Sequence, residues 1–302
     1  MNRRNFLASV SLLPAGLATT PSWAADYTKP ANKNVKWGVS TNIWDQTKAP
    51  YAEILDNMKD AGFIGIRLRG FPGILERWGV SQAQLHTALD KRGLHAITIS
   101  FGLRDPAPEQ RQEVLNSARE AIKFLKDFGA DHLVVFSPSR KPENMTPEAF
   151  KNMCERCNQI GEVAGEMSFT AGLHNHMGQM VQTPQEVDRF MSMTDPKLFG
   201  LSPDTAHLHL GGSDVVPMLE KYKHRIRFLD YKDAKRNAPT FKDSIVDLGD
   251  GEIDFPGCHR VLKSVNYRGW VCVDLDTARL GPLADYKRCG DYVVSKLQPI
   301  YL

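Results

Sequence analysis

A chain of 302 residues with 42% hydrophobic residues is long enough for one large domain or two small ones with a substantial core. Its 38 lysines and arginines nearly balance its 35 aspartates and glutamates. Without Arg3 and Arg4, which lie in an acid-free stretch of 24 residues, the balance is 36 against 35. Because this charge creates no broad basic field, we exclude nucleic acid and anionic membranes as partners.

The first 24 residues have the pattern of an export signal. Arg3 and Arg4 precede a mildly apolar stretch, and residues 22–24 supply the small-x-small pattern that a signal peptidase reads. The apolar stretch is too short, and too rich in small residues and proline, for a membrane span. The segment resembles a twin-arginine signal, with an ordinary Sec signal as the alternative. We therefore expect a mature chain of residues 25–302 that is periplasmic or otherwise exported through the twin-arginine pathway.

The mature sequence alternates short β-rich runs with helical patterns. Residues 113–126 place apolar side chains on one helical stripe, and Pro184 after Thr183 marks the capped start of another helix. Several helical patterns end in a glycine that suits a left-handed C-cap, at Gly62, Gly93 and Gly129. The eight β-rich runs begin near Val35, Phe63, Leu94, His132, Phe169, Leu198, Ile226 and Trp270.

Eight strands that alternate with helices predict an α/β fold, a single-domain (β/α)₈ TIM barrel. The rival is an open doubly wound sheet, which usually carries a glycine-rich phosphate loop after its first strand. Here the corresponding residues 40–45 contain no glycine. The continuous apolar character of several strands also fits a parallel sheet covered by helices. We therefore predict the barrel.

The five cysteines do not form a pattern for metal or disulfide chemistry. Cys154 and Cys157 are spaced as C-x-x-C, but no second pair completes a zinc site. Both fall on the apolar stripe of a predicted helix, so we expect buried, unpaired thiols.

The last four predicted strands each end in a group that can bind a divalent cation. Function in such barrels lies at these carboxyl ends. His174 and His176 end strand five on one face, and Asp204, Asp230 and Asp274 end the next three. Mixed imidazole and carboxylate ligands suit Mn²⁺, Co²⁺, Fe²⁺ or Zn²⁺ better than Ca²⁺, and Mg²⁺ stays open. We predict a metal site of His174, Asp204, Asp230 and Asp274, the alternative being separate polar groups in a solvated pocket.

Five short motifs stand out in the second half of the chain: His-Asn-His-Met-Gly at 174–178, Val-Gln-Thr at 181–183, Asp-Thr-Ala-His at 204–207, Lys-Asp at 232–233 and Gly-Trp at 269–270. With these motifs the sequence resembles the inosose dehydratase branch of the sugar phosphate isomerase/epimerase superfamily, the xylose isomerase-like TIM barrels. The resemblance covers essentially the whole mature chain and implies chemistry on a keto-sugar, keto-glycoside or keto-cyclitol.

Three positions depart from the pattern of the superfamily. Asp230 stands where similar proteins usually have a histidine ligand, and Asp274 stands where they usually have glutamate. Strand two commonly ends in a glutamate that touches substrate, and here that residue is Arg67. Aspartate can still bind a metal, but it is one methylene shorter than glutamate and more charged than histidine. These departures predict a metal site that is harder, shifted or absent.

The resemblance implies an isomerase, an epimerase or a dehydratase (lyase) that acts beside a carbonyl. A divalent metal would make the neighbouring proton acidic, and a positioned base would remove it. His207 is our choice of acid/base, because an imidazole titrates near neutral pH, although it could instead only orient Asp204. Lys232 is expected to stabilise the negative charge that develops on the carbonyl oxygen when the proton leaves, or else to form a structural ion pair. Asp274 is the third residue that we expect to take part in catalysis.

We expect the substrate to be a small carbohydrate or cyclitol, and the enzyme could be a homo-oligomer. Export favours an oxidised sugar or glycoside that is made outside the cytoplasm. Pocket packing is the alternative role for each residue expected to contact the substrate: Asn42, Trp44, Arg67, His176 and His209.

Other function classes fit the sequence less well. A non-catalytic periplasmic sugar-binding barrel that has lost part of the metal site is the main alternative, and bound metal would discriminate the two. An endonuclease of related fold needs a basic groove, which the near-neutral charge does not supply. A glycoside hydrolase needs paired carboxylates at a defined separation, and the histidine-rich fifth strand argues against it.

Overall fold

The computed structural model describes residues 35–103 and 108–301. The predicted export signal, residues 1–24, lies outside these ranges, as does the start of the predicted mature chain. A search of the described helices finds none with the length and apolar character that a bilayer crossing requires.

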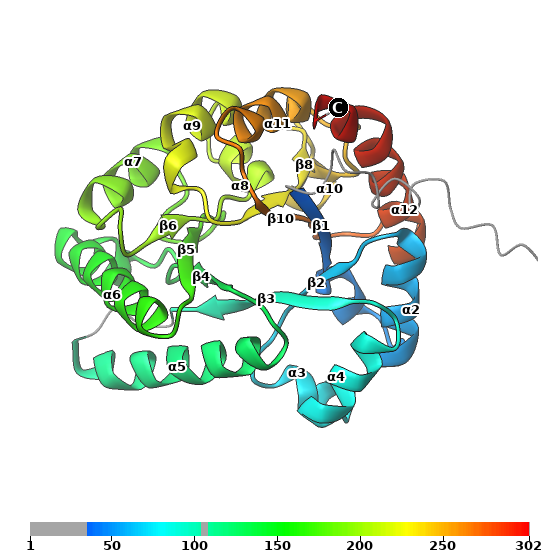
Figure 1. Cartoon of the computed structure of the whole chain (residues 1–302). Coiled ribbons are helices and arrows are strands. Elements are labelled where there is room, and N and C mark those ends of the chain that lie inside the picture. The colour runs from blue at the N-terminus through cyan, green and yellow to red at the C-terminus, as the bar shows by residue number, and fades with distance from the viewer. Residues whose placement is uncertain (1–34, 104–107, 302) are drawn as a thin grey trace, which may run out of the picture.

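Eight parallel strands form the inner ring of the molecule, and helices lie outside it (Figure 1). Their order is β6-β5-β4-β3-β2-β1-β10-β7. Parallel bridges from Leu201 to Ile226 and from Asp204 to Asp230 join the two ends of this order. The single-domain TIM barrel predicted from the sequence is confirmed. The strands are β1 (Val35–Ser40), β2 (Gly65–Leu68), β3 (His95–Gly102), β4 (His132–Phe136), β5 (Thr170–His174), β6 (Gly200–Leu201), β7 (Leu229–Tyr231) and β10 (Gly269–Val273).

The helices follow the strands around the barrel. They are α2 (Tyr51–Ala61), α3 (Ile74–Trp78), α4 (Gln82–Asp90), α5 (Arg111–Asp127), α6 (Pro147–Glu166), α7 (Pro184–Met193), α8 (Thr205–Leu210), α9 (Val215–Tyr222), α10 (Phe241–Ser244), α11 (Phe255–Ser264) and α12 (Pro282–Tyr292). A short 3₁₀ helix, η2 (Asn42–Gln46), follows β1, and a small hairpin of β8 (Asp233–Ala234) and β9 (Ile245–Val246) follows β7. The last turns are η6 (Val293–Leu297) and η7 (Gln298–Tyr301).

The local sequence signals act where they were expected. The Thr183 side chain accepts the backbone N–H of Glu186, and the Glu186 side chain accepts that of Thr183, which caps α7. Gly62 ends α2 with a φ of +92°, a left-handed conformation that a residue without Cβ adopts at little cost. Cys154 and Cys157 are free thiols buried on α6, as predicted.

The inside of the barrel below the strand ends is filled by side chains, some of them polar. Phe228 belongs to a small apolar cluster there, and the ring of His132 stacks on it at 5.6 Å. His132 Nδ1 lies 2.8 Å from Thr170 Oγ1, and His132 Nε2 lies 2.8 Å from Ser202 Oγ. Burial, and then the nearby Arg227, lowers the pKa of His132 to about 3.

Because His132 is buried in its neutral form, we expect the free energy of unfolding to fall at acidic pH. Its pKa rises from about 3 in the folded chain to about 6.5 in the unfolded chain, so the unfolded chain binds more protons below pH 6.5. Stability is therefore lost as the pH falls through this window, by about 2 kcal/mol at pH 5 from His132 alone. Urea unfolding at pH 7 and pH 5 measures the loss.

Two variants separate this contribution from those of the other histidines. His132→Gln should be less stable at pH 7 but should lose less stability between pH 7 and pH 5. His224→Gln, which changes an exposed histidine, should leave the pH dependence of the wild type intact. Identical pH dependence in His132→Gln and the wild type would contradict the interpretation.

Candidate active site

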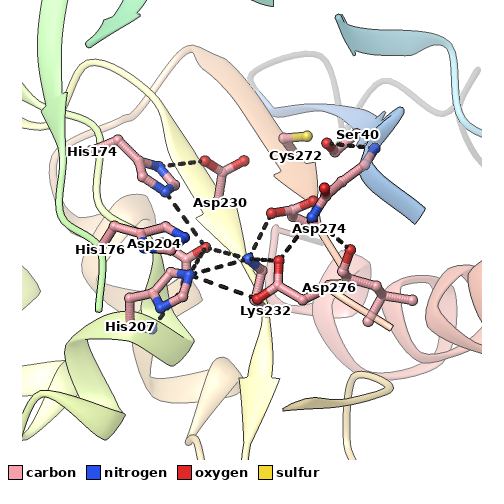
Figure 2. Close-up of polar contacts among 12 residues, drawn as sticks. Ser40, His174, His176, Asp204, His207, Asp230, Lys232, Cys272, Asp274 and Asp276 are labelled. Atoms are coloured by element: carbon pink, nitrogen blue, oxygen red, sulfur yellow. Dashed lines mark hydrogen bonds and ion pairs between the residues drawn. The ribbon is translucent and has the colours of Figure 1, made fainter. Parts of the chain in front are cut away.

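The carboxyl ends of β5, β6, β7 and β10 bring polar side chains into one buried cluster (Figure 2). Parallel strands of a barrel all end at the same rim, so residues far apart in the chain meet there. Each of these side chains is at most 2% exposed. The cluster contains His174, Asp204, His207, Asp230, Lys232 and Asp274.

The Asp-Thr-Ala-His motif positions its two ends through a helix cap. Asp204 is the N-cap of α8, and its Oδ1 accepts the backbone N–H of His207 at 3.0 Å. Its Oδ2 then faces His174 Nε2 and His207 Nε2, each at 3.9 Å. One ligand atom from each of the three residues lies within 4.8 Å of the other two. Small adjustments would bring all three onto one divalent cation.

Arg67 on β2 lies between two of the buried carboxylates. Its Nη1 is 2.5 Å from Asp230 Oδ2, and its Nη2 is 2.8 Å from Asp274 Oδ2. Asp230 Oδ2 is also 3.0 Å from His174 Nδ1, although that contact lacks the alignment of a hydrogen bond. Arg67 therefore joins Asp230 and Asp274 through a single positive charge.

Lys232 is surrounded by carboxylates. Its Nζ lies 2.7 Å from Asp274 Oδ2, 3.1 Å from Asp204 Oδ2 and 3.0 Å from Asp276 Oδ1. His207 Nε2 is 3.4 Å from the same ammonium group. Burial would lower the pKa of Lys232, but Asp204 and Asp274 raise it well above its ordinary value. Lys232 is thus a permanent positive charge beside the three candidate ligands.

The carboxylates of the cluster differ in protonation. Burial, opposed by Lys232, raises the pKa of Asp204 to about 7. Burial, opposed by Arg67, raises that of Asp230 to about 7. Burial also disfavours the charged form of Asp274, but Lys232 and Arg67 hold its pKa well below the usual range. Lys232 and Arg67 therefore favour the ionised form of Asp274, whereas the charges of Asp204 and Asp230 are compensated less completely.

The imidazoles of the cluster are neutral. Burial, and then the cations Arg67 and Lys232, lowers the pKa of His174 and His207 well below the ordinary value. Burial and Lys232 also lower the pKa of His176. A neutral imidazole keeps one nitrogen lone pair, which can bind a metal or accept a proton.

A cavity of about 630 Å³ opens above the cluster. This is within the size range of pockets for small molecules. Phe136 and Phe241 contribute aromatic walls, and Phe241 stacks on His207 at 5.8 Å. We call the part of the cavity lined by the buried His174, Lys232 and Asp274, with His176 and Asp276, its inner end. The part lined by the exposed side chains of Arg69 and Arg77, with Asp45 between them, is its outer part.

The four predicted metal ligands lie together in the cluster, as Figure 2 shows, with the expected catalytic residues His207 and Lys232 among them. Of the expected substrate contacts, His176 lines the cavity with its ring 3.7 Å from that of His207. Asn42 also lines it, but its amide donates to Asp276 Oδ1 at 2.8 Å. Arg67 lies beneath the cavity as a counter-ion.

The structure does not bring Trp44 or His209 to the cavity. Trp44 is 2% exposed, and η2 turns its indole into the core, where it stacks on Tyr286 at 5.0 Å. His209 lies beyond His207 on α8 and contacts Glu252 Oε2 at 2.9 Å. Trp44 is therefore part of the core, and His209 is held by its contact with Glu252.

Two functional positions were missed in the sequence. Asp276 contacts Lys232 and Asn42 and lines the cavity, and the alternation Asp274-Leu275-Asp276 at a strand end was its signal. Asp233 of the Lys-Asp motif supports the site from behind. Its carboxylate accepts the backbone N–H groups of Ala234, Gly249, Gly251 and Ile253.

Comparison with known proteins agrees with this geometry. Residues 55–288 match the family described as xylose isomerase-like TIM barrel. The chain belongs to this family. Inosose dehydratase of Bacillus velezensis is 26% identical over 301 residues, which cover 88% of this chain and 97% of that protein. The superfamily resemblance seen in the motifs is confirmed, and the chain is an enzyme of this family, a dehydratase or an isomerase/epimerase.

Solved structures share the fold. A zinc-binding IOLI protein superposes with a TM-score of 0.72 at 17% identity, over 87% of this chain and 99% of that one. A probable 3-DHS dehydratase from Bacillus anthracis superposes with a TM-score of 0.72 at 13% identity, over 86% of this chain and 99% of that one.

Removing the buried guanidinium should destabilise the barrel. Arg67→Met leaves Asp230 and Asp274 without their shared partner, and we expect it to lower the free energy of unfolding by about 3–5 kcal/mol. Arg67→Lys keeps the charge but loses the fork that spans both carboxylates, so its loss should be smaller. Urea unfolding measures both.

Arg260→Met is the control, because the side chains of Arg260 and of its ion-pair partner Asp254 are 62% and 58% exposed. It should cost no more than about 1 kcal/mol. The assignment of Arg67 would be untenable if Arg67→Met were as stable as Arg260→Met.

Proposed function

We propose that this enzyme removes the proton beside the carbonyl of a keto-sugar, keto-glycoside or keto-cyclitol, with a divalent metal held by His174, Asp204 and His207. The observation that carries the proposal is that these buried groups converge within 4.8 Å beside Lys232. Return of the proton to the neighbouring carbon gives isomerisation, and its return to the other face gives epimerisation. Loss of a β-hydroxyl group gives dehydration. The activity of the inosose dehydratases, to which the chain is similar, supports this class of chemistry.

The charge of the cluster suits a cation. In the part of the chain that the structure describes, the lysines and arginines that contact Asp204, Asp230 and Asp274 are Arg67 and Lys232. Among the described residues, Asp204 Oδ2 and Asp230 Oδ1 are buried without a hydrogen-bond partner. A divalent ion would supply the missing charge and act as a Lewis acid on the carbonyl and its neighbouring hydroxyl.

This ligand set differs from the one expected from the sequence. Asp230 and Asp274 were expected to bind the metal, but both carboxylates contact Arg67 through Oδ2. His207 lies in their place, since the cap at Asp204 holds its ring against the same carboxylate. The proposed site is therefore displaced from Asp230 and Asp274 toward α8.

With His207 in the ligand set, His176 is the better base. Its Nδ1 lies 2.6 Å from the carbonyl oxygen of Met177, so Nδ1 carries the proton and Nε2 keeps the lone pair. Burial and Lys232 lower its pKa, which keeps the imidazole neutral and ready to accept a proton. Lys232, held by Asp204, Asp274 and Asp276, would donate to the oxyanion that forms as the proton leaves.

An exported location through a twin-arginine signal stays part of the proposal, with a substrate that is oxidised outside the cytoplasm. The alternative of a non-catalytic sugar-binding barrel gains no support from the comparisons.

Metal content tests the ligand set. Wild-type protein incubated with Mn²⁺, Co²⁺ or Zn²⁺ and then desalted should retain about one ion per chain, as measured by plasma mass spectrometry. Asp204→Asn should weaken retention by at least about tenfold, because the amide carries no charge. Asp90→Asn, at an exposed site, should retain the ion. Equal retention by wild type and Asp204→Asn would contradict the assignment.

Proton exchange tests the chemistry. In D₂O, wild-type protein with metal should exchange the proton beside the carbonyl of at least one of a 3-keto-glucoside, a keto-inositol, a ketohexose, a ketohexose 6-phosphate and a keto-aldonate, as followed by NMR. His176→Asn should lower the exchange rate by about 100-fold or more while metal content stays normal. If no carbonyl compound exchanges in the metal-loaded wild type, the proposed reaction is wrong.

A further inference from the structure

The outer part of the active-site cavity carries two arginines that share one carboxylate. Arg69 follows β2 and Arg77 lies on α3, and both line the cavity with Asp45 of η2. Arg77 Nη2 is 2.9 Å from Asp45 Oδ1, and Arg69 Nη1 is 3.4 Å from Asp45 Oδ2. Two guanidinium groups against one carboxylate leave this part of the cavity with one excess positive charge.

The protein contacts use a small part of this donor capacity. Arg77 Nη2 also donates to the carbonyl oxygen of Arg69 at 3.0 Å, so one nitrogen of each guanidinium makes the contacts described. Each arginine has five N–H donors. The side chains of Arg69 and Arg77 are 55% and 44% exposed, so further donors can reach a ligand in the cavity.

The backbone makes room for this arrangement. Gly70 also lines the cavity and has a φ of +87°, which side-chain-bearing residues rarely adopt. A Cβ at this position would lie 3.3 Å from Arg77 Nη1, tighter than ordinary contact. A side chain at position 70 would require the guanidinium of Arg77 to move by a few tenths of an ångström.

The two ends of the cavity therefore differ in charge. The inner end has neutral imidazoles, Lys232 and the acidic groups of Asp274 and Asp276, which suit hydroxyl and carbonyl groups. The outer end has the excess positive charge of Arg69 and Arg77. A planar guanidinium pairs with carboxylate and phosphate oxygens through two parallel hydrogen bonds.

We infer that Arg69 and Arg77 bind an acidic group of the substrate, a carboxylate or a phosphate, while its polyol part reaches the inner end of the cavity. The substrate is then a keto compound of the proposed class that also carries a carboxylate or a phosphate. This inference deepens the proposed function, on which it rests for the use of this cavity.

Polyols without a carbonyl group test the inference separately from the reaction, since they cannot be turned over. Isothermal titration would compare D-sorbitol with D-gluconate and with D-sorbitol 6-phosphate, which add a carboxylate and a phosphate. At least one anionic polyol should bind about tenfold more tightly than sorbitol. Whether gluconate or sorbitol 6-phosphate binds more tightly shows whether the site prefers a carboxylate or a phosphate. The advantage should shrink as the salt concentration rises.

Variants assign the effect to the two arginines. The double variant Arg69→Gln with Arg77→Gln should abolish the advantage of the anionic polyol and leave the affinity for sorbitol unchanged. Arg140→Gln is the matched control, because Arg140 pairs with Glu186 and is not part of the cavity lining. It should keep the full advantage.

Asp45→Asn keeps the test informative if the double variant does not fold. It retains both arginines and removes their shared counter-charge, so affinity for the anionic polyol should rise severalfold. Equal affinity for sorbitol and both anionic polyols would overturn the inference. So would inorganic phosphate that binds as tightly as sorbitol 6-phosphate, since the polyol would then contribute nothing.

The two proposals fail in different ways. A normal preference for the anionic polyol without proton exchange on any keto compound would support the acidic-group site and contradict the reaction. Proton exchange on neutral keto-sugars without any preference for an anionic polyol would support the reaction and contradict the acidic-group site.

Discussion

Charge compensation among buried carboxylates is the constraint on which this active site depends. Asp204, Asp230 and Asp274 are all at most 2% exposed, and removing one carboxylate from water without a partner costs several kcal/mol. Arg67 and Lys232 supply two positive charges inside the same cluster. Because both cations contact Asp274 Oδ2, the pKa of that residue is lowered, whereas Asp204 and Asp230 keep raised pKa values. Because the positive charge is distributed unevenly among the three carboxylates, a further cation near Asp204 would be favourable.

The presence of Arg67 explains how the substitutions in this chain fit together. The motif resemblance leads us to expect a histidine at position 230; the aspartate found there adds a negative charge, and the guanidinium of Arg67 lies 2.5 Å from it. The same resemblance leads us to expect a glutamate at position 67, where this chain has a base. The two departures are therefore complementary, because each would be costly without the other. The proposed ligand set uses the three groups that Arg67 does not contact.

The same cavity combines two kinds of positive charge with different uses. Lys232 is fully enclosed and surrounded by carboxylates, which suits stabilisation of charge that develops during a reaction. Arg69 and Arg77 are about half exposed and share a single acid, which suits recognition of charge already present on a ligand. Because Lys232 and the two arginines line the same cavity, one small molecule could contact both kinds of positive charge.

The sequence by itself determined the architecture and most members of the cluster. The alternation of β-rich runs and helical patterns specifies the barrel, and the barrel requires Asp204, Asp230 and Asp274 to meet at one rim, because parallel strands end together. Local signals such as the cap at Thr183 could also be read directly, since they involve neighbours in the chain.

Only the tertiary structure decided which groups are partners within the cluster. The pairing of Arg67 with Asp230 joins residues 163 positions apart, and no local pattern encodes it. The directions of the Trp44 and His209 side chains also depend on residues distant in the sequence, because Trp44 packs on Tyr286 and His209 contacts Glu252. Periodicity places a side chain at the rim of the barrel, but direction and pairing there depend on contacts across the whole ring.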